Sequence, residues 1–540
     1  MSALRVAVVG AAREAADRHA PRLAQERVAS AIRRQDPDLW GPAARAEAAK
    51  RLGWVAAHEV SRPLVAEVTA LREALRADGV DHVVLCGMGG SSLAPEVITA
   101  TAGVELTVLD STDPGQVRRV LHDRLERTAV VVSSKSGTTV ETDSQRRAFE
   151  AAFRAAGIDA AARMVVVTDP GSELERIARD AGYRAVFLAD PDVGGRYSAL
   201  TAFGLVPSGL AGVDVAALLD EAAAVSELLA SDEADNPALV LGAALGGTEP
   251  LRDKVVLLDA GSGLRGFGDW AEQLVAESTG KDGTGLLPVV VAGPGAPEVT
   301  SGAPDVLVVR LTPDAAADDG AAGGAVVSVS GPLGAQFLLW EYATAVAGRL
   351  LGINPFDQPD VESAKQAARG LLEAQPSPEP AVFADGAVEV RGSDGLLDGV
   401  QDLAGAVRAL LGRLDPERGY LAVMAYVDRD TPGLADVRDA LAAATGRPVT
   451  FGWGPRFLHS TGQYHKGGPA TGVYLQVTAG SGDDADAHVP GRPFTFGRLI
   501  AAQAAGDAAV LAQTGRPVLR LHATGPEGLR QVVAALAGRG

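Results

Sequence analysis

The sequence has very little cysteine and no long apolar run. Cys86 is the only cysteine among 540 residues, so no disulfide can form within the chain. This composition suits a reducing compartment and predicts a cytoplasmic protein. No stretch approaches the roughly 18 uninterrupted apolar residues of a membrane span. The N-terminus has no basic head followed by an apolar core, so we expect no signal peptide.

Positive charge is also scarce. The formal net charge is −19, which argues against a nucleic acid or an anionic membrane as partner. A small anionic ligand is still possible, because a pocket can be locally positive on an acidic protein. Only six of the 49 basic residues are lysines, and an ammonium on a flexible stem is not interchangeable with a guanidinium. Four of these lysines lie in the motifs described below, namely Lys135, Lys281, Lys365 and Lys466.

Short apolar runs alternate with helical segments, which predicts an α/β fold. RVAVVGAA near the N-terminus reads as a short strand, and residues 12–76 have apolar positions three and four apart, as in helices. Apolar runs follow at 82–86, 105–109, 128–132, 164–168 and 185–189, and again at 254–260, 286–292, 305–311 and 325–330. This rhythm is typical of parallel sheets covered by helices.

The same pattern divides the chain into five segments. We predict an N-terminal helical segment, two doubly wound parallel-sheet domains, a proline-rich acidic linker and a C-terminal α/β segment. Their bounds, in that order, are 1–76, 77–220, 221–372, 373–392 and 393–540. In the C-terminal segment we expect strands near 421–427, 449–453, 472–478 and 517–522.

Two strand ends of the first sheet are rich in hydrogen-bond donors. CGMGGSSLAPEV (86–97) follows the first strand and SSKSGTTVET (133–142) follows the third. Open parallel sheets bind ligands at the carboxyl ends of their strands, where each loop opens a helix with outward N–H groups. Glycines allow close approach and hydroxyls donate hydrogen bonds, so the loops predict a phosphate cradle. Its candidate residues are Gly90, Ser91, Ser134, Lys135, Ser136 and Thr139. The alternative is that the hydroxyls only cap the helices.

Five motifs in order resemble one enzyme family. The two loops are similar to phosphosugar-binding (SIS) domains. VGGRYSALTAFGL (193–205), WAEQLVAESTGKDGTGLLP (270–288) and GINPFDQPDVESAK (352–365) narrow the resemblance to the glucose-6-phosphate isomerase family. The resemblance implies two flavodoxin-like SIS domains, a small sugar-phosphate substrate, no cofactor or metal, and a homodimer.

An aldose–ketose isomerase opens a sugar ring and moves a proton between C2 and C1 through a cis-enediol. This chemistry needs a carboxylate base in a partly dry site and positive charge near the enediolate. The resemblance implies that Glu277 is the base, with a pKa raised by burial, and that Arg196 stabilises the enediolate. Gln273, one helical turn earlier, would hold sugar hydroxyls or orient the base. Lys365 would assist ring opening, and Gln358 would bind on the phosphate side. The two residues would lie on the same side if the segment between them is helical.

The histidine expected for ring opening stands in an unusual place. A histidine suits this step because its pKa lies near the working pH, and the family carries it between the glutamate and the lysine. No histidine lies between Glu277 and Lys365, but FLHSTGQYHKGGP (457–469) carries the family's motif further on. We predict that His459 reaches the same site, in its own subunit or a partner's, an arrangement that resembles the isomerase part of transaldolase–isomerase fusions. The alternative is a loop with another role, such as anion binding through Lys466.

Two other functions fit part of the pattern. A non-catalytic sugar-phosphate-binding regulator would keep the hydroxyl cradle and lose the base, so the presence of Glu277, Arg196 and Lys365 argues against it. An isomerase that also accepts mannose 6-phosphate would share every motif. The predicted reaction is the interconversion of glucose 6-phosphate and fructose 6-phosphate.

Overall fold

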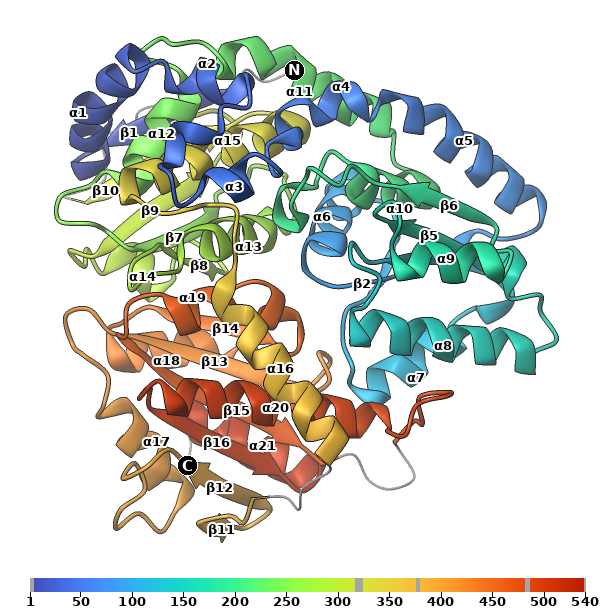
Figure 1. The fold of residues 1–540 in the computed structure, drawn as a ribbon. Coiled ribbons are helices and arrows are strands. Elements are labelled where there is room, and N and C mark those ends of the chain that lie inside the picture. Colours follow the sequence, from blue (N-terminus) through green and yellow to red (C-terminus); the bar gives the residue numbers. More distant parts are fainter. Residues whose placement is uncertain (1–3, 316–323, 375–378, 481–485, 539–540) are drawn as a thin grey trace.

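The protein is built from three sheets, each covered by helices. The computed structural model describes residues 4–315, 324–374, 379–480 and 486–538. Figure 1 shows three lobes: the second sheet with the N-terminal helices, the first sheet beside it, and the C-terminal α/β segment below both. The predicted α/β class with doubly wound parallel sheets is confirmed.

The first sheet is parallel throughout, and all five of its predicted strands are present. Its strands, in spatial order, are β3 (Thr107–Leu109), β2 (His82–Gly87), β4 (Thr128–Ser133), β5 (Met164–Thr168) and β6 (Ala185–Leu188). β2 and β4 are neighbours, with Gly87 opposite Ser133. The winding direction changes between these two strands, which is where open sheets bind ligands. The two donor-rich loops therefore leave the same edge of the sheet from adjacent strands.

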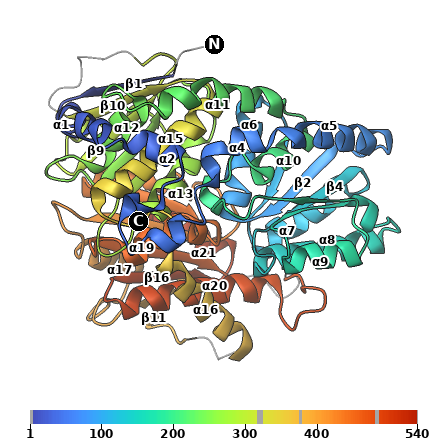
Figure 2. The ribbon, with the colours of Figure 1, turned by 45° about the horizontal axis from the view of Figure 1, so that its top comes forward.

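The second sheet is parallel except for one edge strand. Its order is β1 (Arg5–Val9), β10 (Ala325–Ser330), β9 (Val306–Leu311), β7 (Lys254–Asp259) and β8 (Leu287–Val291). The predicted strand in RVAVVGAA is β1, which pairs antiparallel with β10 at the outer edge of the sheet (Figure 2). Apolar residues of the N-terminal helices join the main core with those of α15 (Leu333–Leu351). The first part of the N-terminal segment thus belongs to the second lobe, whereas Val68 and Leu75, in the helix that precedes β2, join the core of the first sheet.

The helical stretch expected over residues 12–76 is broken into several short pieces. Its helices are α1 (Ala11–Gln25), α2 (Val28–Arg33), η1 (Pro37–Trp40), α3 (Arg45–Ala48), η2 (Gly53–Ala56), α4 (Ala57–Val60) and α5 (Arg62–Ala77). Glycine and proline explain several of the breaks, since Gly41 has φ +84° and Pro37 and Pro63 stand in first turns.

The third sheet is larger than predicted. Its order is β11 (Phe383–Asp385), β12 (Val388–Gly392), β16 (Val518–Ala523), β15 (Gly472–Ala479), β13 (Tyr420–Tyr426) and β14 (Val449–Trp453). The last four are the predicted strands. β11 and β12 lie inside the range predicted as a linker (373–392), of which residues 375–378 are outside the described residues. The linker prediction gave weight to proline and acidic residues and missed the hairpin turn at Gly386-Ala387, where Gly386 has φ +57°.

Further helices pack against the three sheets. The remaining helices are α6 (Leu93–Ala102), α7 (Pro114–His122), η4 (Leu125–Arg127), α8 (Val140–Ala155), η5 (Ala161–Arg163), α9 (Glu173–Asp180), α10 (Ala202–Ala211), α11 (Val215–Leu229), α12 (Pro237–Gly246), α13 (Phe267–Thr279), α14 (Pro297–Thr300), α16 (Pro359–Ala374), α17 (Leu403–Leu411), α18 (Val437–Thr445), α19 (Gly462–Gly467), α20 (Phe496–Gln513) and α21 (Pro526–Leu536). Among the residues described, none of these is both long and apolar enough for a bilayer crossing.

The C-terminal segment packs on both other lobes. One face of the third sheet shares an apolar core with β7, β8 and β9 of the second sheet, while the other face is covered by α17, α18 and α21. Phe496 and Leu499, at the start of α20, enter the core on one face of the first sheet. α16 leaves the second lobe and crosses to the C-terminal one, where it runs beside α20 (Figure 1). The third segment therefore packs against one face of each of the other two sheets.

A buried ion pair joins the second and third lobes and provides a test of this packing. The Arg438 guanidinium on α18 contacts the Glu298 carboxylate on α14, whose side chain is 2% exposed. Arg438→Met should destabilise the protein by about 3–5 kcal/mol, because it leaves a buried carboxylate without its cation. Thermal melting checks this value.

The control is Arg408→Met, since Arg408 is 73% exposed and lies 3.9 Å from Asp402. It should change stability by less than about 1 kcal/mol. Adding Glu298→Gln to Arg438→Met should restore part of the loss. Equal melting temperatures for the Arg438 and Arg408 variants would contradict a role for the buried pair.

Candidate active site

Hydroxyl groups of the two donor-rich loops lie at the sheet edge, and one of them, Ser92 Oγ, donates to the Gly89 carbonyl at 3.1 Å and lies 3.3 Å from Asp110 Oδ2. In the loop after β4, Ser134 Oγ lies 3.1 Å from Thr139 Oγ1 and accepts a hydrogen bond from the Gly137 N–H at 3.2 Å. Thr139 and Ser92 are the N-cap residues of α8 and α6, and neither side chain caps its helix. Helix capping therefore does not account for the hydroxyl groups at these two positions, and the phosphate cradle stays a prediction.

The lysine of this loop is directed away from the hydroxyls. Lys135 Nζ lies 2.6 Å from Asp169 Oδ2 and donates to the Pro191 carbonyl at 3.2 Å. Asp169 follows β5, the neighbouring strand; burial raises the pKa of its carboxyl and Lys135 opposes that rise. Ser136 Oγ lies 3.0 Å from Thr138 Oγ1. The cradle thus consists mainly of hydroxyls and backbone N–H groups, and the charge of Lys135 is shared with Asp169.

The loop after β2 is wedged against three other segments. It forms the 3-10 helix η3 (Gly89–Ser91), in which Ser91 is buried. A Cβ on Gly90 would lie 1.9 Å from the Gly195 carbonyl oxygen. Gly89 has φ +56°, and a Cβ there would lie 2.8 Å from Gln273 Nε2 and 2.9 Å from the Cβ of His459. Only glycine fits these positions, so the loop, α13 and the histidine segment meet at one point.

Glu277, on α13, is held between an amide and a guanidinium. Gln273 Nε2 donates to Glu277 Oε2 at 3.1 Å and to the His459 carbonyl at 2.7 Å. On the other side, Arg196 Nη1 lies 3.4 Å from Glu277 Oε1. Gln273 Oε1 is buried and has no hydrogen-bond partner among the residues described. The carboxylate is therefore fixed in orientation, beside an amide oxygen that can accept from a ligand hydroxyl.

Most donors of Arg196 are bound to protein acceptors. This residue lies on η6 (Gly195–Tyr197) and is 3% exposed. Its Nε donates to Ser278 Oγ at 2.8 Å, and its Nη2 donates to the carbonyls of Pro355 at 2.8 Å and Asp357 at 3.1 Å. Nη1 donates to Gln358 Oε1 at 2.8 Å. The guanidinium therefore clamps the loop before α16 and keeps one Nη1 proton on the side of the base.

Gln358 lies outside the helix that carries Lys365. The assumption that one helix spans both residues is wrong, because α16 begins at Pro359 and the residue before a proline is disfavoured in α conformation. Gln358 accepts a hydrogen bond from Arg196, whereas Lys365 lies on α16. The phosphate-side role of Gln358 stays a prediction.

Lys281 is a second cation of the same clamp, and the sequence interpretation gave it no role. Its Nζ donates to the carbonyls of Asn354 at 2.7 Å and Asp357 at 2.6 Å, and lies 2.7 Å from Asp357 Oδ1. Burial lowers its pKa to about 8, and the charge of Arg196 adds to this. Its position in the motif ESTGK was the signal that could have identified it.

His459 lies beside a buried carboxylate of the first sheet's loop. Its Nε2 is 3.3 Å from Glu141 Oε1, in the first turn of α8. Burial alone would raise the pKa of Glu141, but the hydrogen bond and charge of His459, with the charge of Lys365, hold it below its usual range. Glu141, His459 and Lys365 therefore act on one another within a single chain. Glu141 belongs to the SSKSGTTVET motif, but the sequence interpretation assigned it no function.

The histidine segment is tied to α13 and α16 by its other motif residues. Gln463 Nε2 donates to the Gly280 carbonyl at 2.9 Å and to Asp360 Oδ2 at 2.6 Å, and its Oε1 accepts from the Asp360 N–H. Ser460 Oγ donates to Glu272 Oε1 at 2.7 Å. These contacts fix the segment at the site and explain the Ser-Thr-Gly-Gln part of the motif.

The rest of that motif is buried structure. The His465 ring contacts the Tyr420 hydroxyl at 3.1 Å, and burial lowers the pKa of His465 well below its usual value. Lys466 Nζ lies 2.5 Å from Asp507 Oδ1, and both side chains are almost fully buried. Lys466 is thus committed to Asp507, which argues against the anion-binding alternative for this loop.

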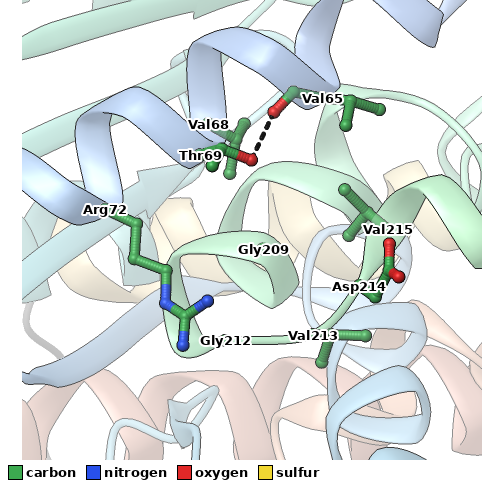
Figure 3. A pocket seen from close by; sticks show the side chains of 9 residues that line it. All are labelled: Val65, Val68, Thr69, Arg72, Gly209, Gly212, Val213, Asp214 and Val215. Carbon is green, nitrogen blue, oxygen red and sulfur yellow. Dashed lines mark hydrogen bonds between the residues drawn. The ribbon is translucent and has the colours of Figure 1, made fainter.

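A separate hollow of about 220 Å³ lies away from these residues. Figure 3 shows it between α5 and the turn from α10 to α11. It is lined by Val65, Val68, Thr69, Arg72, Gly209, Gly212, Val213, Asp214 and Val215. None of the site residues described above lines it, so it is not part of the same site.

The part of the chain that matches a known protein family includes several of the residues described above. A family model described as "Phosphoglucose isomerase" matches residues 67–282. That range includes both loops, Arg196, Gln273 and Glu277, and it ends before Lys365 and His459.

Relatives of known name match a longer part of the chain. A probable glucose-6-phosphate isomerase of Natronomonas pharaonis is 32% identical over 371 residues, which are 60% of this chain and 86% of that protein. A glucose-6-phosphate isomerase of Synechococcus elongatus is 32% identical over 346 residues, 54% of this chain and 65% of that protein. The chain thus spans slightly less than two thirds of the second relative.

Two solved structures resemble the fold. A hypothetical protein from Thermus thermophilus is 28% identical, with a TM-score of 0.58, and the match covers 68% of this chain and 100% of that one. A glucose-6-phosphate isomerase from Chlamydia trachomatis is 22% identical, with a TM-score of 0.50, over 60% of this chain and 75% of that one. At this identity the second match supports the fold alone.

The close approach at Gly90 can be tested with two alanine substitutions, one on each side of the contact. Gly90→Ala should force η6 away from η3 and lower stability by about 1–3 kcal/mol, the usual cost of overpacking. Gly195→Ala is the matched control, because nothing lies within 4 Å of a Cβ at that position. Melting temperatures measure the difference, and a Gly90→Ala protein as stable as the control would contradict the observed packing.

Proposed function

Because the chain belongs to the phosphoglucose isomerase family, whose members are aldose–ketose isomerases, we propose that it interconverts glucose 6-phosphate and fructose 6-phosphate. The observation that carries this proposal is the placement of Glu277. Its carboxylate is held by Gln273 and Arg196 directly beside the glycine loop that follows β2. A base fixed next to an anion cradle is the arrangement that proton transfer within a sugar phosphate needs.

The phosphate binds at the edge of the first sheet. Hydroxyls of Ser134, Ser136 and Thr139 and the N–H groups at the start of α8 donate to its oxygens. Gly90 and Ser91 border the same place from β2. The sugar carbons then extend toward α13, where the unpaired Oε1 of Gln273 accepts from a sugar hydroxyl.

Ring opening is the role of the residues around Glu141. His459 donates a proton to the ring oxygen, and Glu141 holds the imidazole in orientation and stabilises its charged form. Lys365 lies close enough to Glu141 to lower the pKa of that carboxyl, so its charge also reaches the sugar oxygens and stabilises O1 while the O1 proton passes to water. This half of the site produces the open-chain aldehyde.

Proton transfer is the role of the residues on α13 and η6. Glu277 removes the C2 proton, which gives a cis-enediolate, and returns the proton to C1. The Nη1 proton of Arg196 on the side of the base and the charge of Lys281 behind it lie where negative charge develops. No step requires a metal or a cofactor.

We also propose a homodimer, the commonest closed assembly, in the cytoplasm, where a single buried thiol at Cys86 is not at risk of pairing. His459 and Glu141 of one chain lie 3.3 Å apart. Each subunit of the proposed dimer therefore completes its own site.

The proposed reaction is tested by converting fructose 6-phosphate to glucose 6-phosphate in a coupled assay, with mannose 6-phosphate in parallel. Glu277→Gln should bind substrate nearly as wild type does and lower turnover by about 100-fold or more, the scale of general base catalysis. Failure of the wild-type chain to convert fructose 6-phosphate would favour the non-catalytic regulator. A Glu277→Gln variant with normal turnover would remove this residue as the base.

A mixing experiment tests whether each chain completes its own site. Glu277→Gln and His459→Ala chains, carrying different tags, are co-expressed and the mixed dimer is isolated through both tags. If His459 acts within its own chain, the mixed dimer has no intact site and shows only the sum of the two residual activities. If a partner supplied His459, one of the two sites would be intact, and activity would rise to about half that of the wild-type dimer.

A further inference from the structure

The C-terminal segment contributes a second residue to the site besides His459. We propose that Gln503, on α20, is a positioning residue that holds Glu141, and through it His459, in the geometry needed for ring opening. This proposal rests on the isomerase function argued above and names a further residue of the same site.

Gln503 contacts the same oxygen as the histidine. Its Nε2 donates to Glu141 Oε1 at 2.7 Å, and that oxygen lies 3.3 Å from His459 Nε2. Gln503 is 3% exposed and Glu141 is 5% exposed, so water does not replace this bond. The amide and the imidazole thus fix one carboxylate oxygen from two directions.

The orientation of the amide is set from its other end. Thr112, fully buried after β3, donates from its hydroxyl to Gln503 Oε1 at 2.7 Å. Glu141, with its depressed pKa, is a carboxylate that can only accept. A flipped Gln503 would place its oxygen against that carboxylate, so only one orientation satisfies both neighbours. The result is a chain of hydrogen bonds from Thr112 through Gln503 and Glu141 to His459.

A neutral donor suits this position better than a charged one. A hydrogen bond to a charged group is stronger than one between neutral groups, and an amide supplies it without cancelling the negative charge. The charge of Glu141 is then still available to the imidazolium of His459. A lysine in place of Gln503 would compete with His459 for the carboxylate of Glu141, and a glutamate would repel that carboxylate.

The same helix also sets the position of the ring-opening lysine. Gly506 lies one turn after Gln503 on α20, and a Cβ there would lie 2.9 Å from the backbone nitrogen of Ala368. Ala368 lies one turn after Lys365 on α16. Because the two helices meet this closely, α20 fixes α16 as well as Glu141. The contacts of Gln503 described above are with Glu141 and Thr112 and not with the base on α13, so this helix serves ring opening and not proton transfer.

The test compares a ring substrate with one that cannot close. The variant is Gln503→Met, which keeps the volume and removes the donor, and the matched control is Gln513→Met, an exposed residue at the end of the same helix. Glucose 6-phosphate is the ring substrate. The open-chain probe is 5-deoxyfructose 6-phosphate, which lacks the hydroxyl that closes its ring, and proton exchange at C1 in deuterium oxide is followed by NMR.

We expect turnover of glucose 6-phosphate to fall by about tenfold or more in Gln503→Met, a partial loss of acid–base catalysis, and exchange in the open-chain probe to fall by less than about threefold. Gln513→Met should match wild type on both. His459→Ala should show the same selectivity, since it removes the group that Gln503 positions. Equal losses on the two substrates, or no loss on either, would overturn the proposal.

Melting temperatures show whether each variant is folded. If Gln503→Met does not fold, a second variant provides the test. Thr112→Val removes the hydroxyl that orients the amide and keeps the shape, so it should reproduce the selective loss in smaller measure. Conversion of glucose 6-phosphate by the wild-type protein tests the isomerase function separately from the role of Gln503. If the wild type does not convert it, the proposed function fails. If the wild type converts it but the Gln503 and Thr112 variants lose activity equally on both substrates, only the positioning role is refuted.

Discussion

The site depends on one buried negative charge, the carboxylate of Glu141. A carboxylate removed from water costs several kcal/mol unless charges and donors surround it. Here the groups that stabilise it are His459, Gln503 and Lys365, and none of them belongs to the lobe that carries Glu141 on α8. These stabilising contacts exist only when the C-terminal segment and α16 are docked against the first lobe.

The C-terminal segment achieves this by covering the other two lobes at once. Its sheet takes the place of a helical layer on one face of the second sheet, and the start of α20 enters the core of the first. Polar contacts fix the docking: Arg456 Nη1 donates to Asp110 Oδ2 at 3.1 Å, at the end of β3. A polar cluster at this third strand end, Asp110-Ser111-Thr112, thus anchors the segment in the same way that the other two strand ends form the cradle.

The cationic side chains of the predicted motifs are bound to protein acceptors. Arg196 and Lys281 are both buried and together bind the loop of residues 354–358, so they set the entry of α16 as well as the electrostatics around Glu277. Lys135 and Lys466 are each paired with an aspartate. Backbone carbonyls and carboxylates thus hold these four cations in place and limit their motion.

The sequence by itself determined most of the strands, because strand formation depends on neighbouring residues. Apolar runs predicted β1 to β10 and β13 to β16. It missed β11 and β12, where a two-residue turn outweighed a proline-rich composition. The candidate residues and the cradle at the glycine- and hydroxyl-rich strand ends stay predictions. Only the tertiary structure decided that His459 lies beside Glu141, that Lys135 is paired with Asp169, that Lys281 binds the loop before α16, and that Gln503 contacts Glu141. These are contacts between residues tens to hundreds of positions apart, and their distances follow from how whole sheets pack and not from any local pattern.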